Sequence, residues 1–208
     1  MSSMADYQTL QGADLGAFFR ARDAVALGIH PRRLGGLVSE GYIEKYGRGL
    51  YRFRDSEAKA LELESYVMLS TAVPNAIICL ASALSIHEIG TQSPSQVWFA
   101  IDRKARMPRN LPIQSRIVRF SGAMLTYGVE DRMAQGVSFR ITSPARTIVD
   151  CFRYRRTCGL DIALEALYDV IRGRDISVDE IERAAEVCRV RTVIAPYIDA
   201  FGWIDSLG

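Results

Sequence analysis

Hydrophobic positions near the start of the chain recur with the period of a helix, in two short runs separated by a turn. Ala24 and Gly28 have the spacing of a helix-turn-helix, in which a small residue packs between the helices and a glycine opens the turn. Three apolar residues then share one face at i, i+3, i+4 spacing: Leu34, Leu37 and Val38. The pattern predicts one helix over about residues 22–27 and a second helix that begins at Pro31.

Both sides of this motif carry further signals. Two β-prone segments, 42–46 and 50–53, are joined by Gly47-Arg48-Gly49, which is typical of a hairpin and would form a wing. Before the motif, three apolar residues predict a supporting helix that ends near Arg20: Leu15, Phe18 and Phe19. After the wing, we expect a connecting helix over about 57–72 that stops before Pro74.

The rest of the chain predicts a mixed α/β domain that ends in helices. Strands are expected at 76–80, 97–101, 113–120 and 137–142, and helices at 82–89, after Ser143-Pro144, around 163–171, after Ser177 and over 193–201. The fold class is therefore α+β, with a winged helix-turn-helix followed by a mixed α/β domain. We expect the winged helix in 1–55, the connecting helix in 56–75 and the second domain in 76–208.

The polar face of the second helix has the chemistry that a DNA major groove requires. Arg32, Gly36 and Ser39 point away from the apolar face, so we expect Arg32 to read base edges, with Ser39 as a second contact. Arg33 and His30 would reach phosphates near the start of the helix. Gly36 would allow the backbone to approach DNA closely, or would pack against a neighbouring helix. On the wing, Arg48 would enter the minor groove or bind phosphate.

Composition narrows the class of protein. The chain has 208 residues, a formal net charge of +2 and 49% hydrophobic residues, with no apolar run long enough for a membrane span. Four scattered cysteines and two histidines form no recognisable zinc motif. These features predict a soluble, reduced, cytoplasmic protein with no metal and no cofactor.

Charge is distributed unevenly along the chain. The helix-turn-helix and its wing form a first basic stretch, with eight Lys or Arg residues against three acids between Arg20 and Arg54. A second basic stretch has six Lys or Arg residues against one acid, and it comprises Arg103, Lys104, Arg106, Arg109, Arg116 and Arg119. This stretch is either a secondary polyanion-binding patch or a solvated face. The run from Arg153 to Arg156 is a basic-aromatic cluster. It either contacts phosphates or an acidic partner, or it is a solvated loop. Arg146 and Asp150 have the i, i+4 spacing of an ion pair, which we expect on the surface or between helices.

Enzyme motifs are mostly absent, so we expect no catalytic activity. One alternative is that Asp102-Arg103-Lys104, after a buried strand, resembles the end of a restriction-nuclease metal site. That chemistry needs another carboxylate, for which Glu88 on the preceding helix is the nearest candidate.

Three stretches together resemble a known family, the antitoxin and autorepressor component of AbiE-type toxin–antitoxin systems. They are the helix-turn-helix with its wing from Leu34 to Arg52, the Ser-Pro-x-Arg-Thr-x-x-Asp helix start at Ser143, and the segment 152–167. The resemblance implies a two-domain repressor that binds inverted repeats upstream of its own operon and counters a nucleotidyltransferase-like toxin. It assigns DNA contact to Arg32 and Arg33 in the helix and to Lys45, Arg48 and Arg52 in the wing.

The sequence thus predicts a sequence-specific DNA-binding repressor, the antitoxin of such a pair, with double-stranded DNA as its first partner and no membrane. Two other interpretations stay open beside the nuclease. The helix-turn-helix could dock a protein only, which predicts weak, salt-insensitive DNA binding. The chain could also be a solitary regulator without a toxin.

Overall fold

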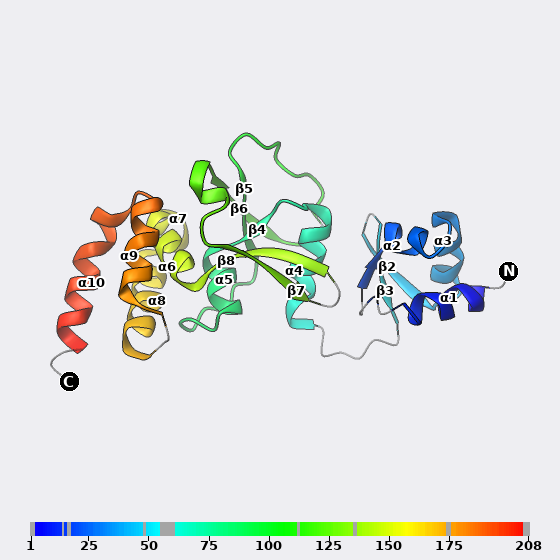
Figure 1. Ribbon diagram of the computed structural model, residues 1–208, viewed down its shortest axis with the longest axis horizontal. Coiled ribbons are helices and arrows are strands. Elements are labelled where there is room, and N and C mark those ends of the chain that lie inside the picture. The colour runs from blue at the N-terminus through cyan, green and yellow to red at the C-terminus, as the bar shows by residue number, and fades with distance from the viewer. Residues whose placement is uncertain are drawn as a thin grey trace. The chain divides into compact units, whose positions relative to one another are not determined.

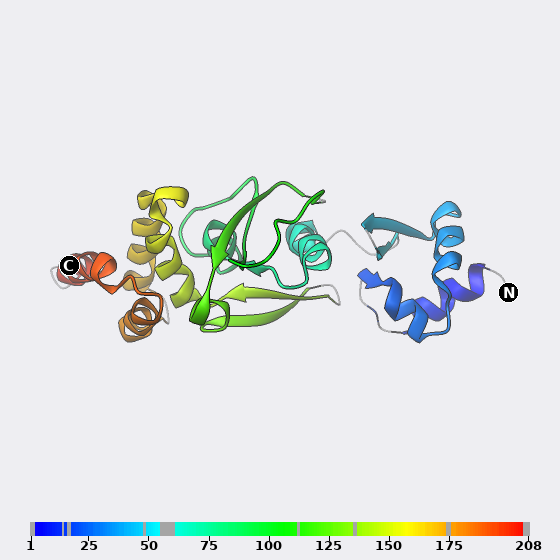
Figure 2. The ribbon, with the colours of Figure 1, turned by 90° about the horizontal axis from the view of Figure 1, so that it is seen from above.

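A computed structural model describes residues 3–13, 15, 18–47, 49–54, 61–111, 113–134, 137–173 and 176–205. Figures 1 and 2 show the ribbon from two sides. The chain forms two compact units. The first unit comprises Met1–Pro74, Pro108–Ile113 and Arg132–Phe139, and the second comprises Asn75–Met107, Gln114–Asp131 and Arg140–Gly208. Each is described by itself.

The first unit contains a winged helix-turn-helix. Its elements are α1 (Ser3–Gln11), β1 (Phe18–Arg20), α2 (Ala21–Ala26), α3 (Pro31–Ser39), β2 (Ile43–Gly47), β3 (Leu50–Phe53) and α4 (Leu61–Ala72). The three strands form an antiparallel sheet in the order β1-β3-β2. The predicted turn, the second helix of the motif and the hairpin after it are therefore present.

Local sequence explains the turn between α2 and α3. Gly28 adopts φ +80°, a conformation that glycine reaches without a steric penalty, and Pro31 occupies the first turn of α3, where no amide donor is needed. Ala24 of α2 is fully buried against this turn. Leu34 and Leu37 of α3 are also fully buried, in a core that includes Tyr7, Phe19, Tyr51 and Phe53.

The predicted supporting helix before Arg20 is wrong. Phe18 and Phe19 lie in β1, which pairs with β3, and the supporting helix is α1, earlier in the chain. Successive side chains of a strand point to opposite faces of the sheet. Phe19 accordingly stacks on Tyr51, at 5.7 Å between ring centroids, while Phe18 meets Tyr46 edge-on at 5.2 Å. A pair of adjacent buried aromatics therefore indicated a strand buried on both faces.

A five-stranded mixed sheet follows α4. It contains β4 (Ile77–Ile78), β5 (Val97–Asp102), β6 (Ser115–Phe120), β7 (Val129–Ala134) and β8 (Val137–Thr142), in the order β6-β5-β4-β8-β7. β4 is antiparallel to β5 and parallel to β8, and β5 is parallel to β6. The prediction missed β7 because its sequence, Val-Glu-Asp-Arg-Met-Ala, buries only its last residue.

Helices make up most of the second unit. They are α5 (Leu80–Ile86), α6 (Pro144–Arg153), α7 (Arg155–Cys158), α8 (Leu160–Gly173), α9 (Val178–Val187) and α10 (Arg191–Asp205), with a 3₁₀ turn at Gly122–Leu125. One hydrophobic core joins α6, α8, α9 and α10 to one face of the sheet. α9 begins with the predicted capping box between Ser177 and Glu180. The fold class predicted from the sequence, mixed α/β after a winged helix-turn-helix, is confirmed.

Candidate nucleic-acid interface

The first turn of α3 is built around His30. Its Nδ1 accepts a hydrogen bond from the backbone N–H of Arg32 at 3.2 Å, and so the imidazole caps the helix. A ring nitrogen that accepts in this way leaves the proton of neutral imidazole on Nε2. His30 is exposed, so it combines a capping role with a free donor position at the end of the helix where DNA phosphates are usually bound.

Arg32 presents an unengaged cation on the outer face of α3. Its side chain is exposed and makes no hydrogen bond or ion pair with any residue that the structure describes. Ser39, also exposed, donates from Oγ to the carbonyl of Gly36 at 2.8 Å. Since the buried residues of α3 lie on the other side, this face carries a long flexible donor near its start and a hydroxyl near its end.

Arg33 has a structural contact that sequence reasoning missed. Its Nη2 lies 2.5 Å from Oδ2 of Asp6, a buried carboxylate on α1. The pair ties α1 to α3 and fixes the direction of the helix. No sequence signal indicated this contact, because Asp6 lies in a helix that the hydrophobic pattern did not predict.

The two glycines of α3 differ in surroundings. A Cβ on Gly36 would lie 4.0 Å from Oγ of Ser3 in α1, an ordinary contact, whereas Gly35 has nothing within 4 Å. Gly36 is half-buried and Gly35 is exposed. Gly35 rather than Gly36 therefore offers bare helix backbone to solvent, and Gly36 lies toward the neighbouring helix.

The wing cations also divide into two kinds. Lys45 is exposed on β2, with no ion pair to another described side chain. Arg52 is half-buried: its Nη1 donates to the hydroxyl of Tyr46 at 3.0 Å, and its guanidinium lies 5.8 Å from the ring centroids of Phe18 and of Tyr46. The hydrogen bond to Tyr46 raises the pKa of Arg52. Arg48, at the tip, lies outside the described residues.

This geometry coincides with a recognised sequence family. Residues 13–54 match the AbiEi antitoxin family of transcriptional regulators. The AbiEi match begins after α1 and ends with the wing, so it covers the helix-turn-helix and the hairpin that follows it.

Fold comparison finds a similar structure over almost the whole chain. The crystal structure of the RV2827C protein from Mycobacterium tuberculosis is similar, with a TM-score of 0.62 and 16% sequence identity, over 97% of this chain and 78% of that one. No curated protein matches the sequence. In the part of the chain that the structure describes, no helix is long and apolar enough to cross a membrane.

Beyond the AbiEi-matched segment, the second basic stretch is not one uniform surface. Arg116 and Arg119 lie three residues apart on β6 and so point to opposite faces of the sheet. The guanidinium of Arg116 lies 5.0 Å from the ring centroid of Trp98, and Nη1 of Arg119 donates to the carbonyls of Asp102 and Ala105 at 3.0 and 2.6 Å. The remaining members are exposed on the connection after β5: Arg103, Lys104, Arg106 and Arg109. Arg119 therefore holds that connection in place.

Within the described part of the chain, Asp102 and Glu88, the two carboxylates of the nuclease alternative, do not have the surroundings that a metal site requires. Oδ1 of Asp102 accepts from the backbone N–H of Lys104 at 2.7 Å, within the turn after β5. Glu88 lies beyond the end of α5, at φ +56°, and not on the helix as predicted. Among the described residues, no group of three or more His, Cys, Asp or Glu side chains could hold a metal ion.

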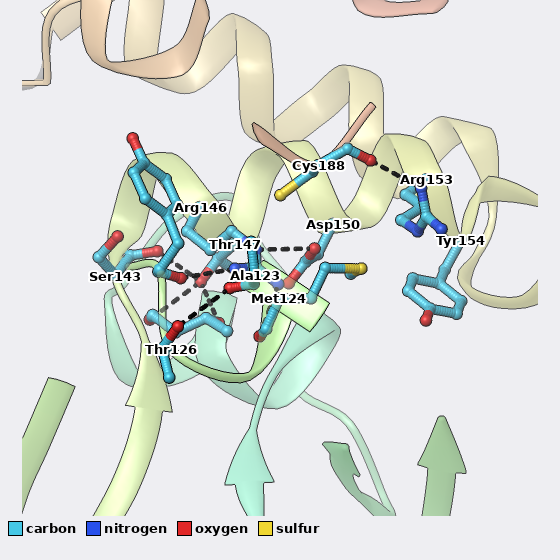
Figure 3. Close-up of polar contacts among 12 residues, drawn as sticks. Ala123, Met124, Thr126, Ser143, Arg146, Thr147, Asp150, Arg153, Tyr154 and Cys188 are labelled. Carbon is cyan, nitrogen blue, oxygen red and sulfur yellow. Dashed lines mark hydrogen bonds and ion pairs between the residues drawn. The ribbon is translucent and has the colours of Figure 1, made fainter. Parts of the chain in front are cut away.

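The ion pair of α6 is buried, which corrects the expectation of a surface or interhelix pair. Nε of Arg146 lies 2.9 Å from Oδ1 of Asp150 within the same helix, and both side chains are completely buried (Figure 3). Arg146 also donates from Nη1 to the carbonyl of Tyr127 at 2.6 Å and from Nη2 to that of Met124 at 3.2 Å. The arginine thus connects α6 to the segment that leads into β7.

This packing depends on a glycine and affects the charge of the carboxylate. A Cβ on Gly128 would lie 2.9 Å from Cβ of Arg146 and 3.0 Å from Oγ of Ser143, and Gly128 has φ +58°. Desolvation raises the pKa of Asp150 to about 6, although Arg146 opposes the shift. Oδ2 of Asp150 has no hydrogen-bond partner among the described atoms.

Proposed function

We propose that this chain is a sequence-specific DNA-binding repressor of its own operon and the antitoxin of an AbiE-type toxin–antitoxin pair. The AbiEi match supports a regulatory antitoxin role. The observation that carries the DNA-binding part is the exposed, unengaged guanidinium of Arg32 on the first turn of α3. In helix-turn-helix proteins, the first residues of this helix are the ones that contact base edges in the major groove.

The geometry suggests a division of roles around Arg32. Ser39 is the second base-edge candidate on the same face. His30 and Lys45 would contact phosphates, which fix the register of the protein on the duplex without reading its sequence. Arg33 would act mainly through Asp6, by holding α3 in the orientation that presents Arg32. Arg48 keeps its proposed minor-groove or phosphate contact at the wing tip.

The proposal also assigns roles to the parts of the chain. Residues 1–55 would bind an operator with inverted repeats, residues 56–75 would connect the domains, and residues 76–208 would oppose a nucleotidyltransferase-like toxin. Because an operator with inverted repeats has two-fold symmetry, it would bind two copies of this chain.

A gel-shift titration tests the DNA-binding part. DNA from upstream of the gene and scrambled DNA of the same length and composition are compared at about 50 and 200 mM salt, a range over which phosphate-anchored binding weakens strongly. We expect preferential binding of the upstream DNA that weakens steeply with salt. Equal binding of both DNAs, or binding that salt does not affect, would favour the alternative of a protein-docking module.

A growth assay tests the antitoxin part separately. A nucleotidyltransferase-like gene beside this one is expressed alone or with the full-length chain. Restored growth supports the antitoxin role, and an Arg32→Ala variant that restores growth from an unrelated promoter would show that antitoxicity does not need operator binding. If co-expression leaves growth arrested, the chain is a regulator without antitoxin activity.

A further inference from the structure

A cleft in the second unit lies where α6 and α9 end. It has a volume of about 240 Å³, and its lining includes Ser121, Gly122, Arg153, Cys188 and Arg189. An adjoining hollow of about 330 Å³ shares Arg153 and Arg189 and adds Tyr154, Arg155, Val190 and Val193. Among the residues that the structure describes, no acidic side chain lines either space, although the carboxyl-terminal part of the sequence is rich in acids. The basic-aromatic cluster noted in the sequence therefore opens onto a concave, positively charged site.

Arg153 is held across this cleft. Its Nη1 donates to the carbonyl of Cys188 at 2.7 Å, a contact that links the last turn of α6 to the residues after α9 (Figure 3). A guanidinium has five N–H donors, and this bond uses one of them. The contact fixes the position of the charge and so reduces the entropy lost when a ligand binds to it.

Arg189 occupies a backbone position that favours glycine. It has φ +56° and follows the C-terminal cap of α9, where the backbone N–H of Val190 returns to the carbonyl of Ala185 at 2.9 Å. Helices commonly place glycine in this left-handed position. The Arg189 side chain is exposed and makes no hydrogen bond or ion pair with the residues described. Nothing within the fold accounts for an arginine here, so the side chain is available to an external ligand.

We propose that this cleft binds the phosphate group of a small phosphorylated ligand between Arg153 and Arg189. Two planar guanidiniums match the oxygens of a phosphate through paired, charge-assisted hydrogen bonds. Because no acidic side chain belongs to the described lining, the repulsion that an anion would meet is limited to that of the buried Asp150, which interacts electrostatically with Arg153. The volumes admit a phosphate with a small organic group, whereas a duplex or a folded protein could not enter.

The decisive variant is Arg189→Gly, because its expected effects on binding and on stability have opposite signs. Glycine relieves the left-handed backbone, so the urea midpoint followed by tryptophan fluorescence should stay the same or rise. Loss of one guanidinium should weaken phosphate binding by about tenfold or more. Binding is measured on the full chain by amide chemical shifts, with inorganic phosphate and with ribose 5-phosphate as separate probes. The amides of residues 121–123 and 188–190 should respond.

Two controls separate the cleft from general effects. Glu88→Gly introduces glycine at another left-handed position of the same unit, also at φ +56°, and should leave phosphate binding unchanged. Arg183→Gln removes an exposed charge from α9 outside the cleft and should also leave binding unchanged.

Several results would overturn the proposal. They are no response of the wild-type chain to either probe, unchanged binding by the Arg189→Gly variant, or an equal loss in the Arg183→Gln variant. Tighter binding of ribose 5-phosphate than of inorganic phosphate would support an organic ligand, and equal binding of the two would support phosphate itself. Operator binding should be unaffected by Arg189→Gly, so this test is independent of the proposed repressor function.

Discussion

Each unit of the molecule contains an Arg–Asp pair with a buried carboxylate, and these two pairs differ in both sequence separation and burial. Arg33 and Asp6 join two helices, with the arginine side chain 33% exposed, whereas Arg146 and Asp150 lie within one helix and are both 0% exposed. The i, i+4 spacing indicated the second pair, but not its burial. The first pair gave no local signal at all. Sequence spacing therefore identifies partners within a helix, while burial is decided by what packs over them.

The two pairs also use arginine for different purposes. The guanidinium of Arg146 contacts a carboxylate and two backbone carbonyls, so all of its side chain serves the fold. In α3, the two adjacent arginines have different roles: Arg33 anchors the helix through Asp6, whereas the side chain of Arg32 is exposed. An anchored helix that carries a free cation is what a recognition helix needs, because the anchor limits the freedom that is lost on binding.

Breaking the buried pair should have the largest effect. Arg146→Met leaves the buried carboxyl of Asp150 without its partner and removes the donors to the carbonyls of Met124 and Tyr127. The free energy of unfolding should fall by about 3–5 kcal/mol. Both tryptophans, Trp98 and Trp203, lie in the second unit, so fluorescence during urea unfolding reports on this unit.

Two further variants test this prediction. Arg156→Met, at an exposed position of α7, should change stability little. Replacing both partners, with Arg146→Met and Asp150→Leu, should recover part of the loss, because no charge is then left buried. An Arg146→Met variant as stable as the wild type would contradict a structural role for the pair.

Stability of the second unit should fall as the pH rises from about 4 to 7. Burial raises the pKa of Asp150 from 3.8 to about 6 in the folded chain. The folded state therefore binds this proton more tightly than the unfolded state, and the stabilisation is complete below about pH 4 and lost as the pH passes 6. The shift of about two units corresponds to roughly 3 kcal/mol.

The pH prediction is checked by comparing urea midpoints at pH 5 and pH 7.5. In Asp150→Asn, the part of the pH dependence that comes from this carboxyl should disappear, whatever the variant does to absolute stability. If the urea midpoints of the wild type and of Asp150→Asn rise by the same amount between pH 5 and pH 7.5, the raised pKa of Asp150 is contradicted.

Breaking the pair between Asp6 and Arg33 should matter less. Asp6→Asn removes the charge opposite Arg33, and since the arginine side chain is one-third exposed and screened by solvent, we expect a loss of about 1 kcal/mol in the first unit. Hydrogen exchange should show faster opening of α1 and α3, with no change in the fluorescence-detected unfolding of the second unit. Glu44→Gln, which breaks the exposed pair with Arg54, is the control and should have almost no effect. Equal effects of the two variants would mean that Asp6 does not anchor α3.

Much of the fold was predictable because its signals are local. The turn at Gly28, the start of α3 at Pro31, the hairpin and the capping box at Ser177 all depend on residues close in sequence. The failure at Phe18 and Phe19 has a long-range cause. Recognising these residues as a strand requires knowledge of β3, whose paired residues Arg52 and Tyr51 lie 34 and 32 positions further along the chain.

The candidate site follows the same rule. The exposure of Arg32 followed from the helical period, because Leu34 and Leu37 define the buried face. The contacts of Arg33 with Asp6 and of Arg52 with Tyr46 and Phe18 depend on tertiary packing, which no spacing in the sequence encodes.

The most direct test of the account is the ratio of affinities for operator and scrambled DNA, measured by gel shift for the wild type, Arg32→Ala and Lys45→Ala. If Arg32 reads base edges, Arg32→Ala should lose about 1–3 kcal/mol of specific binding, so that the ratio falls by roughly 5- to 150-fold. Lys45→Ala should weaken binding to both DNAs equally and reduce the dependence of the affinity on salt concentration. A ratio that Arg32→Ala leaves unchanged would contradict the central claim that the free arginine of α3 reads the operator.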